Sequence, residues 1–268
     1  MTHVRLLACR RAGATVERAA STRTTEQPGK PPSHQMPNSK HATAAARVRP
    51  RASQRKVQTR RILAERALIE AAEELYARHG LDGVSLREIG AYAGSANNSV
   101  VQHHFGGKDN LIRAIFEFNL VELDAVRAQR LAAAEAAGLL GDLKTLVETL
   151  LLPIAQHENS QGRTTYLGFL LAVQQGQSIS KLRDDSDHIA PVTRRLITMI
   201  RDLRSELPDG VFKIRLAGAS LLFFSQMARI ATDEAPEMPR NAVMDDAIDQ
   251  AVAVLAAAYR PRAHLRST

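Results

Sequence analysis

Side chains that can hydrogen-bond with nucleic acid bases are concentrated in one short stretch, residues 97–103. Asparagine and glutamine amides can pair with adenine, a serine hydroxyl can bind a base or a phosphate, and a valine methyl can contact thymine. If this stretch opens a helix, its first side chains can enter a DNA major groove. The candidates for such contacts are Asn97, Asn98, Ser99, Val100, Gln102 and His103. For the two asparagines the alternative role is helix capping alone, and for the glutamine and histidine it is a solvated helix face.

The segment from Ser85 to Lys108 predicts two short helices around a glycine turn. Ser85 and Glu88 have the spacing of a capping box, in which the two side chains satisfy open backbone N–H groups at a helix start. Apolar residues then recur at helical spacing up to Gly94, which suits the left-handed end of a helix. The second helix would end at Gly106-Gly107. Two helices in this arrangement can lay the second one in a major groove.

The sequence SLREIGAYAG, followed by NNSVVQHHFGGKDNL, resembles the DNA-binding domain of TetR-family transcriptional regulators. The resemblance covers roughly residues 60–120, and its most specific part is His104, Phe105 and Lys108. The turn from Gly94 to Phe105 is one residue longer than in most members, and Gln102 stands where an aromatic residue is common. The resemblance implies an all-helical C-terminal half with a small-molecule pocket.

Four further residues are candidates for contacts with the DNA backbone: Arg60, Arg61, Ser85 and Lys108. The two arginines stand near the start of the first predicted helix, and the alternative is a pair of solvated charges. Lys108 begins a long helix, where a positive charge opposes the helix dipole unless an anion such as a phosphate binds there. The alternatives are a surface lysine at this position and, for Ser85, capping alone.

The net charge of +8 resides in an N-terminal arm. Up to Arg61 there are 14 Lys and Arg residues and two acidic residues, a net charge of +12, so the rest of the chain carries −4. The arm, residues 1–55, is rich in Pro, Ser, Thr, Gln and Arg, a composition that predicts disorder. It could neutralise DNA phosphates, or it could be a solvated tail. Met36 lies inside this arm and is an alternative start of translation to Met1.

Hydrophobic periodicity predicts helices along the rest of the chain, with no strand pattern of useful length. The expected helices span residues 55–79, 108–136, 142–156, 164–175, 191–207, 211–232 and 240–259. On the first of these, four glutamates are expected to point outward: Glu65, Glu70, Glu73 and Glu74. The predicted fold class is therefore all-α, with an N-terminal three-helix, helix-turn-helix domain and a C-terminal helical domain.

The predicted domains are the arm (1–55), a helix-turn-helix DNA-binding domain (56–120), a helical ligand-binding and dimerisation domain (121–260) and a tail (261–268). Residues 216–231 are apolar nearly all round, which implies burial on more than one side. The last helix carries an apolar seam of Met244, Ile248, Ala251, Leu255 and Ala258. Two such helices per subunit could form a four-helix homodimer interface, and the alternative is an ordinary core within one subunit.

Several classes of site are not indicated by the sequence. The single cysteine, Cys9, excludes an internal disulfide and fits a reducing compartment. No catalytic, nucleotide-binding or metal-binding motif occurs, so we expect no enzyme, no cofactor and no metal. The adjacent His103 and His104 diverge by about 100° on a helix, and His157, Glu158 and His188 are isolated. No apolar stretch reaches the length of a membrane span, which predicts a cytoplasmic protein.

These patterns favour a sequence-specific, DNA-binding transcriptional regulator, a repressor that an unidentified, apolar small molecule releases from double-stranded operator DNA. The alternative is a helical ligand-binding sensor or enzyme whose helix-turn-helix is only structural. By residue type alone, pocket candidates are Tyr166, Phe169, Phe223, Phe224, Gln226 and Met227, each of which could equally be core. The effector, the operator sequence and the regulated genes are not encoded in any motif, nor is repression as opposed to activation.

Overall fold

The computed structural model describes residues 51–97, 99–176, 182, 185–186, 188–231 and 238–260, and the elements among them are helices without strands. The helices are α2 (Arg51–His79), α3 (Leu86–Tyr92), α4 (Val100–Phe105), α5 (Lys108–Ala136), α6 (Leu143–Ala155), α7 (Tyr166–Gly176), α9 (Pro191–Leu203), α10 (Asp209–Ala231) and α11 (Arg240–Ala256). The predicted all-α class is confirmed. Asn98, the segment before Arg51 and the tail after Arg260 lie outside the described residues.

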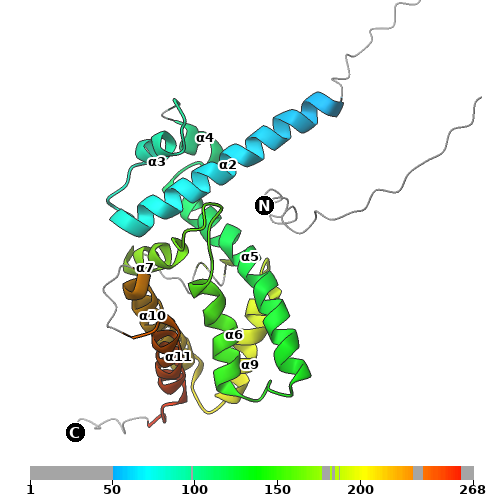
Figure 1. Cartoon of the computed structure of the whole chain (residues 1–268), viewed down its shortest axis with the longest axis vertical. Helices are drawn as coiled ribbons and strands as arrows, with labels where there is room; N and C mark the ends of the chain where they lie inside the picture. The colour runs from blue at the N-terminus through cyan, green and yellow to red at the C-terminus, as the bar shows by residue number, and fades with distance from the viewer. Residues whose placement is uncertain are drawn as a thin grey trace, which may run out of the picture.

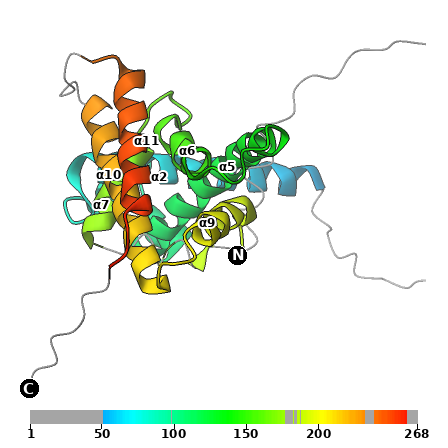
Figure 2. The ribbon, with the colours of Figure 1, turned by 90° about the horizontal axis from the view of Figure 1, so that it is seen from below.

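The first four helices form a unit at one end of the molecule (Figure 1). Fully buried side chains from all four helices form its core, including Tyr76, Ile89, Val101 and Leu111. The first turns of α2 extend beyond this unit, and their side chains are exposed from residue 54 to residue 61 (Figures 1 and 2). α4 therefore has a rigid support on one side and an open face on the other.

The remaining helices form a larger body, into which α5 continues from the first unit (Figure 1). Its core includes Leu146, Phe169, Ile200 and Phe223. α10 and α11 lie side by side and antiparallel at one edge of this body (Figures 1 and 2). By length and composition α10 could cross a membrane, but one such helix is weak support for a membrane segment because core helices share these features.

Several helix boundaries lie where the sequence predicted them, and others differ by a few residues. α5 spans Lys108–Ala136 as expected, and Asp142 caps α6 by accepting a hydrogen bond from the Thr145 N–H at 2.8 Å. α2 begins at Arg51 instead of residue 55. α9 ends at Leu203 instead of residue 207, and its C-cap residue Arg204 has non-helical φ and ψ of −121° and 37°. α11 ends at Ala256 instead of residue 259, and arginines from α10 and the preceding turn bind its last carbonyl groups.

The expectation that four glutamates of α2 point outward was wrong for three of them: Glu65, Glu73 and Glu74 are buried. Residues far along the chain supply polar partners that make this burial possible. Glu73 accepts a hydrogen bond from the Asn119 amide at 2.7 Å and another from the Thr165 hydroxyl. Glu74 pairs with Arg163. The second half of α2 is therefore covered on more than one side, which a single helical stripe in the sequence does not reveal.

Candidate DNA-binding site

Both ends of α3 are formed by local hydrogen bonds. The Ser85 hydroxyl accepts a bond from the Glu88 N–H at 3.2 Å, and the Glu88 carboxylate accepts one from the Ser85 N–H at 2.8 Å. At the other end of α3, Gly94 has a φ of 78°. Its N–H binds the Ala91 carbonyl, and the next N–H binds the Gly90 carbonyl. The predicted capping box and left-handed helix end are both confirmed.

α3 and α4 are in close contact at Gly90. A Cβ atom on Gly90 would lie 2.9 Å from Cγ1 of Val100, so only glycine allows this contact without a shift. Val101, the next residue of α4, is fully buried in the core. These two contacts fix the rotation of α4 about its axis. Val100 is consequently half-buried against α3.

Four of the candidate base-contacting residues are exposed: Asn97, Ser99, Gln102 and His103. The Asn97 side chain accepts a bond from the Ser99 N–H at 2.9 Å, so it has a capping role at the start of α4. Ser99 occupies the N-cap position without a side-chain capping bond. The Gln102 amide donates to the Gly106 carbonyl at 2.9 Å. The four side chains thus form one polar face at the start and middle of α4.

The candidate phosphate-contacting residues have different surroundings. Arg60 is exposed, while Arg61 is held by Glu65 at 2.8 Å. The Ser85 hydroxyl is engaged in the capping box, where it also donates a hydrogen bond to the Glu88 carboxylate at 2.7 Å. Lys108 pairs with Asp82 at 2.9 Å, and this aspartate is fully exposed. Exposed ion pairs contribute little to stability, so Lys108 can exchange Asp82 for a phosphate at small cost.

His104 joins α4 to α2, which the base-reading interpretation of the sequence did not include. Its Nδ1 lies 3.3 Å from Oε1 of buried Glu65, and Arg61 binds the same oxygen. The His104 ring also meets the His103 ring edge to face, with centroids 5.3 Å apart. A residue pair separated by 39 positions leaves no signal in a single sequence.

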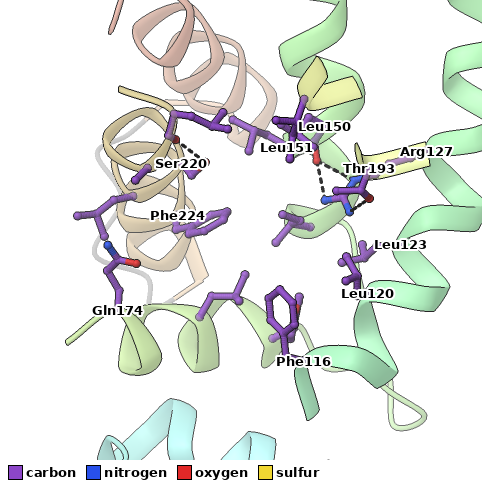
Figure 3. A pocket seen from close by; sticks show the side chains of 17 residues that line it. Phe116, Leu120, Leu123, Arg127, Leu150, Leu151, Gln174, Thr193, Ser220 and Phe224 are labelled. Atoms are coloured by element: carbon purple, nitrogen blue, oxygen red, sulfur yellow. Dashed lines mark hydrogen bonds between the residues drawn. The ribbon is translucent and has the colours of Figure 1, made fainter. Parts of the chain in front are cut away.

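A pocket with a cavity volume of about 80 Å³ lies in the body, between α5, α6, α7, α9 and α10 (Figure 3). Of the pocket candidates chosen by residue type, Tyr166 and Phe224 line it. Phe169, Phe223 and Met227 are buried in the core elsewhere. Gln226 instead donates a hydrogen bond to Gln250 on α11 at 2.7 Å. Among the described residues, one charged side chain lines the pocket, that of Arg127, which was missed because arginine is normally solvated.

Within the described part of the chain, no group of three or more His, Cys, Asp or Glu side chains could hold a metal ion. His157 lies 2.6 Å from the Asn119 side chain, and His188 is exposed.

Residues 68–115 match the family described as bacterial regulatory proteins, tetR family. Over 70 residues the chain is 36% identical to the HTH-type transcriptional repressor Rv3405c of Mycobacterium tuberculosis, covering 26% of this chain and 37% of that protein. The same figures hold for the HTH-type transcriptional regulator Mb3439c of Mycobacterium bovis. The chain thus spans little more than a third of the length of the curated relatives it matches.

A crystal structure of a Mesorhizobium loti protein, described as a TetR-family transcriptional regulator, overlaps 73% of this chain and 98% of its own at 16% identity and a TM-score of 0.40. An overlap of this size does not by itself establish a common fold. The assignment rests on the helix-turn-helix region, where local geometry, the family match and the relatives agree. In that region the chain is similar to the TetR family of transcriptional regulators.

Proposed function

We propose that the protein binds operator DNA through α4 and represses transcription until a small molecule occupies the pocket of the body. The exposed polar face of α4, fixed in rotation by Gly90 and Val101, carries this proposal. A short helix with amide, hydroxyl and imidazole groups on its open side has the shape and chemistry of a major-groove reader. The repressor named among the relatives supports the direction of regulation.

The proposed DNA contacts divide into two groups. Base contacts come from the face of α4, and phosphate contacts come from the surrounding helix starts. The base-contacting set is Asn97, Asn98, Ser99, Val100, Gln102 and His103, and the phosphate-contacting set is Arg60, Arg61, Ser85 and Lys108. The capping bonds of Asn97 and Ser85 are compatible with these roles only if DNA binding replaces or extends them.

The proposed DNA-reading unit is a homodimer through α10 and α11. The apolar seam of α11 does not serve this purpose, because Ile248, Ala251 and Leu255 are buried within the subunit. The support comes from α10, where Ile214 is 75% exposed and Leu221 is 37% exposed. With the exposed Gly218 between them, these residues follow one face of the helix. A dimer would give the two α4 helices access to half-sites about 34 Å apart.

We also propose that residues 56–120 act as the DNA-binding domain and residues 121–260 as the ligand-binding and dimerisation domain, in a cytoplasmic protein. α5 runs through both parts. Its first turns pack under α4, and further along Phe116, Leu120 and Arg127 line the pocket. A ligand shifts the equilibrium between DNA-binding and released forms only by its difference in affinity for the two.

The test is a fluorescence anisotropy titration of the full chain against the DNA upstream of its own gene, with a scrambled duplex of equal composition. We expect specific binding at least about 1,000-fold tighter than binding to the scrambled duplex. The affinity should fall steeply as salt concentration rises. Equal affinity for the two duplexes would refute the proposal and favour a helix-turn-helix that is only structural.

A further inference from the structure

In the part of the chain that the structure describes, the pocket of the body is lined by a single charged group, the guanidinium of Arg127. The other lining side chains are apolar or neutral, and Arg127 itself is only 3% exposed. Its Nε and one terminal nitrogen donate to the Leu150 carbonyl at 3.1 and 2.8 Å. The other terminal nitrogen donates to the Thr193 hydroxyl at 2.9 Å. Figure 3 shows Arg127 and Thr193 on one wall of the pocket, with Ser220 and Phe224 on the opposite wall.

No carboxylate in the described part of the chain forms an ion pair with Arg127. The nearest acidic partner, Asp124, is reached only through Thr193, whose hydroxyl lies 2.7 Å from the aspartate. Asp124 is already satisfied, because it also accepts the backbone N–H groups of Thr193 and Val192 at 2.6 and 3.2 Å. A guanidinium has five N–H donors, and three are used here. Two donors are left for a pocket ligand.

Burial of this kind is costly for a cation. Burial lowers the pKa of Arg127 to about 10, with the Tyr166 and Asp124 charges acting in the opposite direction, so the group still carries its charge at neutral pH. Neutral donors would suffice to bind one carbonyl and one hydroxyl if Arg127 only joined α5 to α6 and α9. A desolvated cation lacking a paired carboxylate is normally unfavourable, and an anionic ligand would remove that cost.

We infer that the effector of this regulator is an apolar molecule bearing one carboxylate, which binds Arg127 in the pocket. The inference rests on the proposed function, since it names the chemical class of the effector. A planar guanidinium binds a carboxylate through two parallel hydrogen bonds, and a single cation balances a single negative charge. The hydroxyl of Tyr166 lines the same pocket and can donate a neutral hydrogen bond to the anion, whereas the Thr193 hydroxyl already donates to Asp124. The leucine and phenylalanine walls suit an apolar remainder.

The cavity volume of about 80 Å³ equals only a few water molecules at about 30 Å³ each. Typical ligand pockets hold about 300 Å³ or more, so side chains must move apart when an effector binds. The length of the apolar part is therefore tested with a series of probes.

The experiment measures binding of straight-chain carboxylates, from butanoate to dodecanoate, and of benzoate and 4-butylbenzoate to the full chain without DNA. Each acid is compared with its methyl ester by isothermal titration calorimetry. We expect at least one acid to bind, and to bind about tenfold or more tightly than its ester. In Arg127→Met the acid should fall to the affinity of the ester, with the ester unchanged, whereas Arg127→Lys should keep part of the preference.

The matched control is Arg130→Met, one turn along α5, where the arginine is bound to Gln156 at 2.9 Å outside the pocket. It should leave the preference for the acid unchanged. If Arg127→Met fails to fold by circular dichroism, Arg127→Lys and the comparison of acid with ester in the unaltered chain decide the outcome. Failure of every acid to bind, or equal binding of acids and esters, overturns the inference. If the unaltered chain does not distinguish operator DNA from the scrambled duplex but still binds acids more tightly than esters, only the proposed function is refuted.

Discussion

Gln102 lies on the exposed face of α4, and its amide bonds only to the Gly106 carbonyl within the same short helix. The side chain therefore contributes little to folding, while its position allows a paired contact with adenine.

We predict that Gln102→Ala weakens operator binding by about 1–3 kcal/mol, roughly ten- to a hundredfold, and changes the melting temperature very little. Anisotropy titration and differential scanning calorimetry measure the two effects. Gln129→Ala, at an exposed glutamine of α5, is the control and should change neither quantity. Unaltered operator affinity in Gln102→Ala would remove this residue from the proposed reading face.

Glu73 is a buried carboxylate that accepts hydrogen bonds from Thr165 and Asn119 and nevertheless has a raised pKa. Burial raises its pKa to about 6, and the neighbouring Glu70 and Glu122 charges act in the same direction. The hydrogen bonds from Thr165 and Asn119 oppose the shift without cancelling it. A raised folded-state pKa adds stability that is complete below the ordinary value of 4.5 and is lost as pH rises through about 6.

We compare the free energy of unfolding of the unaltered chain with that of Glu73→Gln at each pH. We predict that the difference, unaltered chain minus variant, falls by about 2 kcal/mol from pH 4.5 to pH 7.5. Urea denaturation at several pH values measures this difference, in which the other titrating groups cancel. Glu88→Gln provides a control of opposite sign, because hydrogen bonds from Ser85 lower the pKa of exposed Glu88. A flat difference for Glu73→Gln across this range would contradict its assignment as a buried, ionised group.

At the scale of elements, the second half of α2 is where the unit of the first four helices meets the body. Glu70, Glu73 and Glu74 bond in turn to Ser160, Thr165 and Arg163, which precede α7. α7 follows this segment and packs directly on α2. The two helices are in close contact at Gly168, where a Cβ atom would lie 2.8 Å from Cβ of Ala77 and 3.3 Å from its backbone.

We predict that Gly168→Ala destabilises the protein by about 1–3 kcal/mol, because backbone atoms of α2 must move. Alanine is favoured over glycine by about 1 kcal/mol inside a helix, and the clash has to outweigh this gain. Gly210→Ala in the first turn of α10 is the control, since its Cβ would meet no atom within 4 Å and should not destabilise. Chemical denaturation compares the two variants, and equal stability would show that α2 and α7 can separate without cost.

At the scale of the whole molecule, the exposed apolar residues of α10 are relevant to the oligomeric state. Ile214 is the most exposed large apolar side chain of the described residues. Exposed apolar side chains that line up on one helix face mark interaction sites more often than isolated ones do.

We predict that Ile214→Glu shifts the protein from dimer to monomer, because burying a carboxylate at a symmetric interface places two like charges together. Sedimentation equilibrium measures the change, and operator affinity should fall with it. Val126→Glu, at a partly exposed valine of α5, is the control and should leave the dimer intact. An unaltered protein that is monomeric at micromolar concentration would refute the proposed interface.

The sequence alone determined the features that depend on neighbours in the chain. The Ser85–Glu88 capping box and the Gly94 turn were both predicted, because each hydrogen bond spans only a few residues. Together they predicted the all-α class and the location of the polar face.

Only the tertiary structure decided which polar residues are buried. Glu73 and Arg127 stand among charged neighbours in the sequence and read as solvated, yet both are buried. Their partners lie far away in the chain: Asn119 for Glu73, and Leu150 and Thr193 for Arg127. Helical periodicity records how apolar a face is but not which distant donors or acceptors will cover it. For that reason the cation in the pocket became visible only once α5, α6 and α9 were packed together.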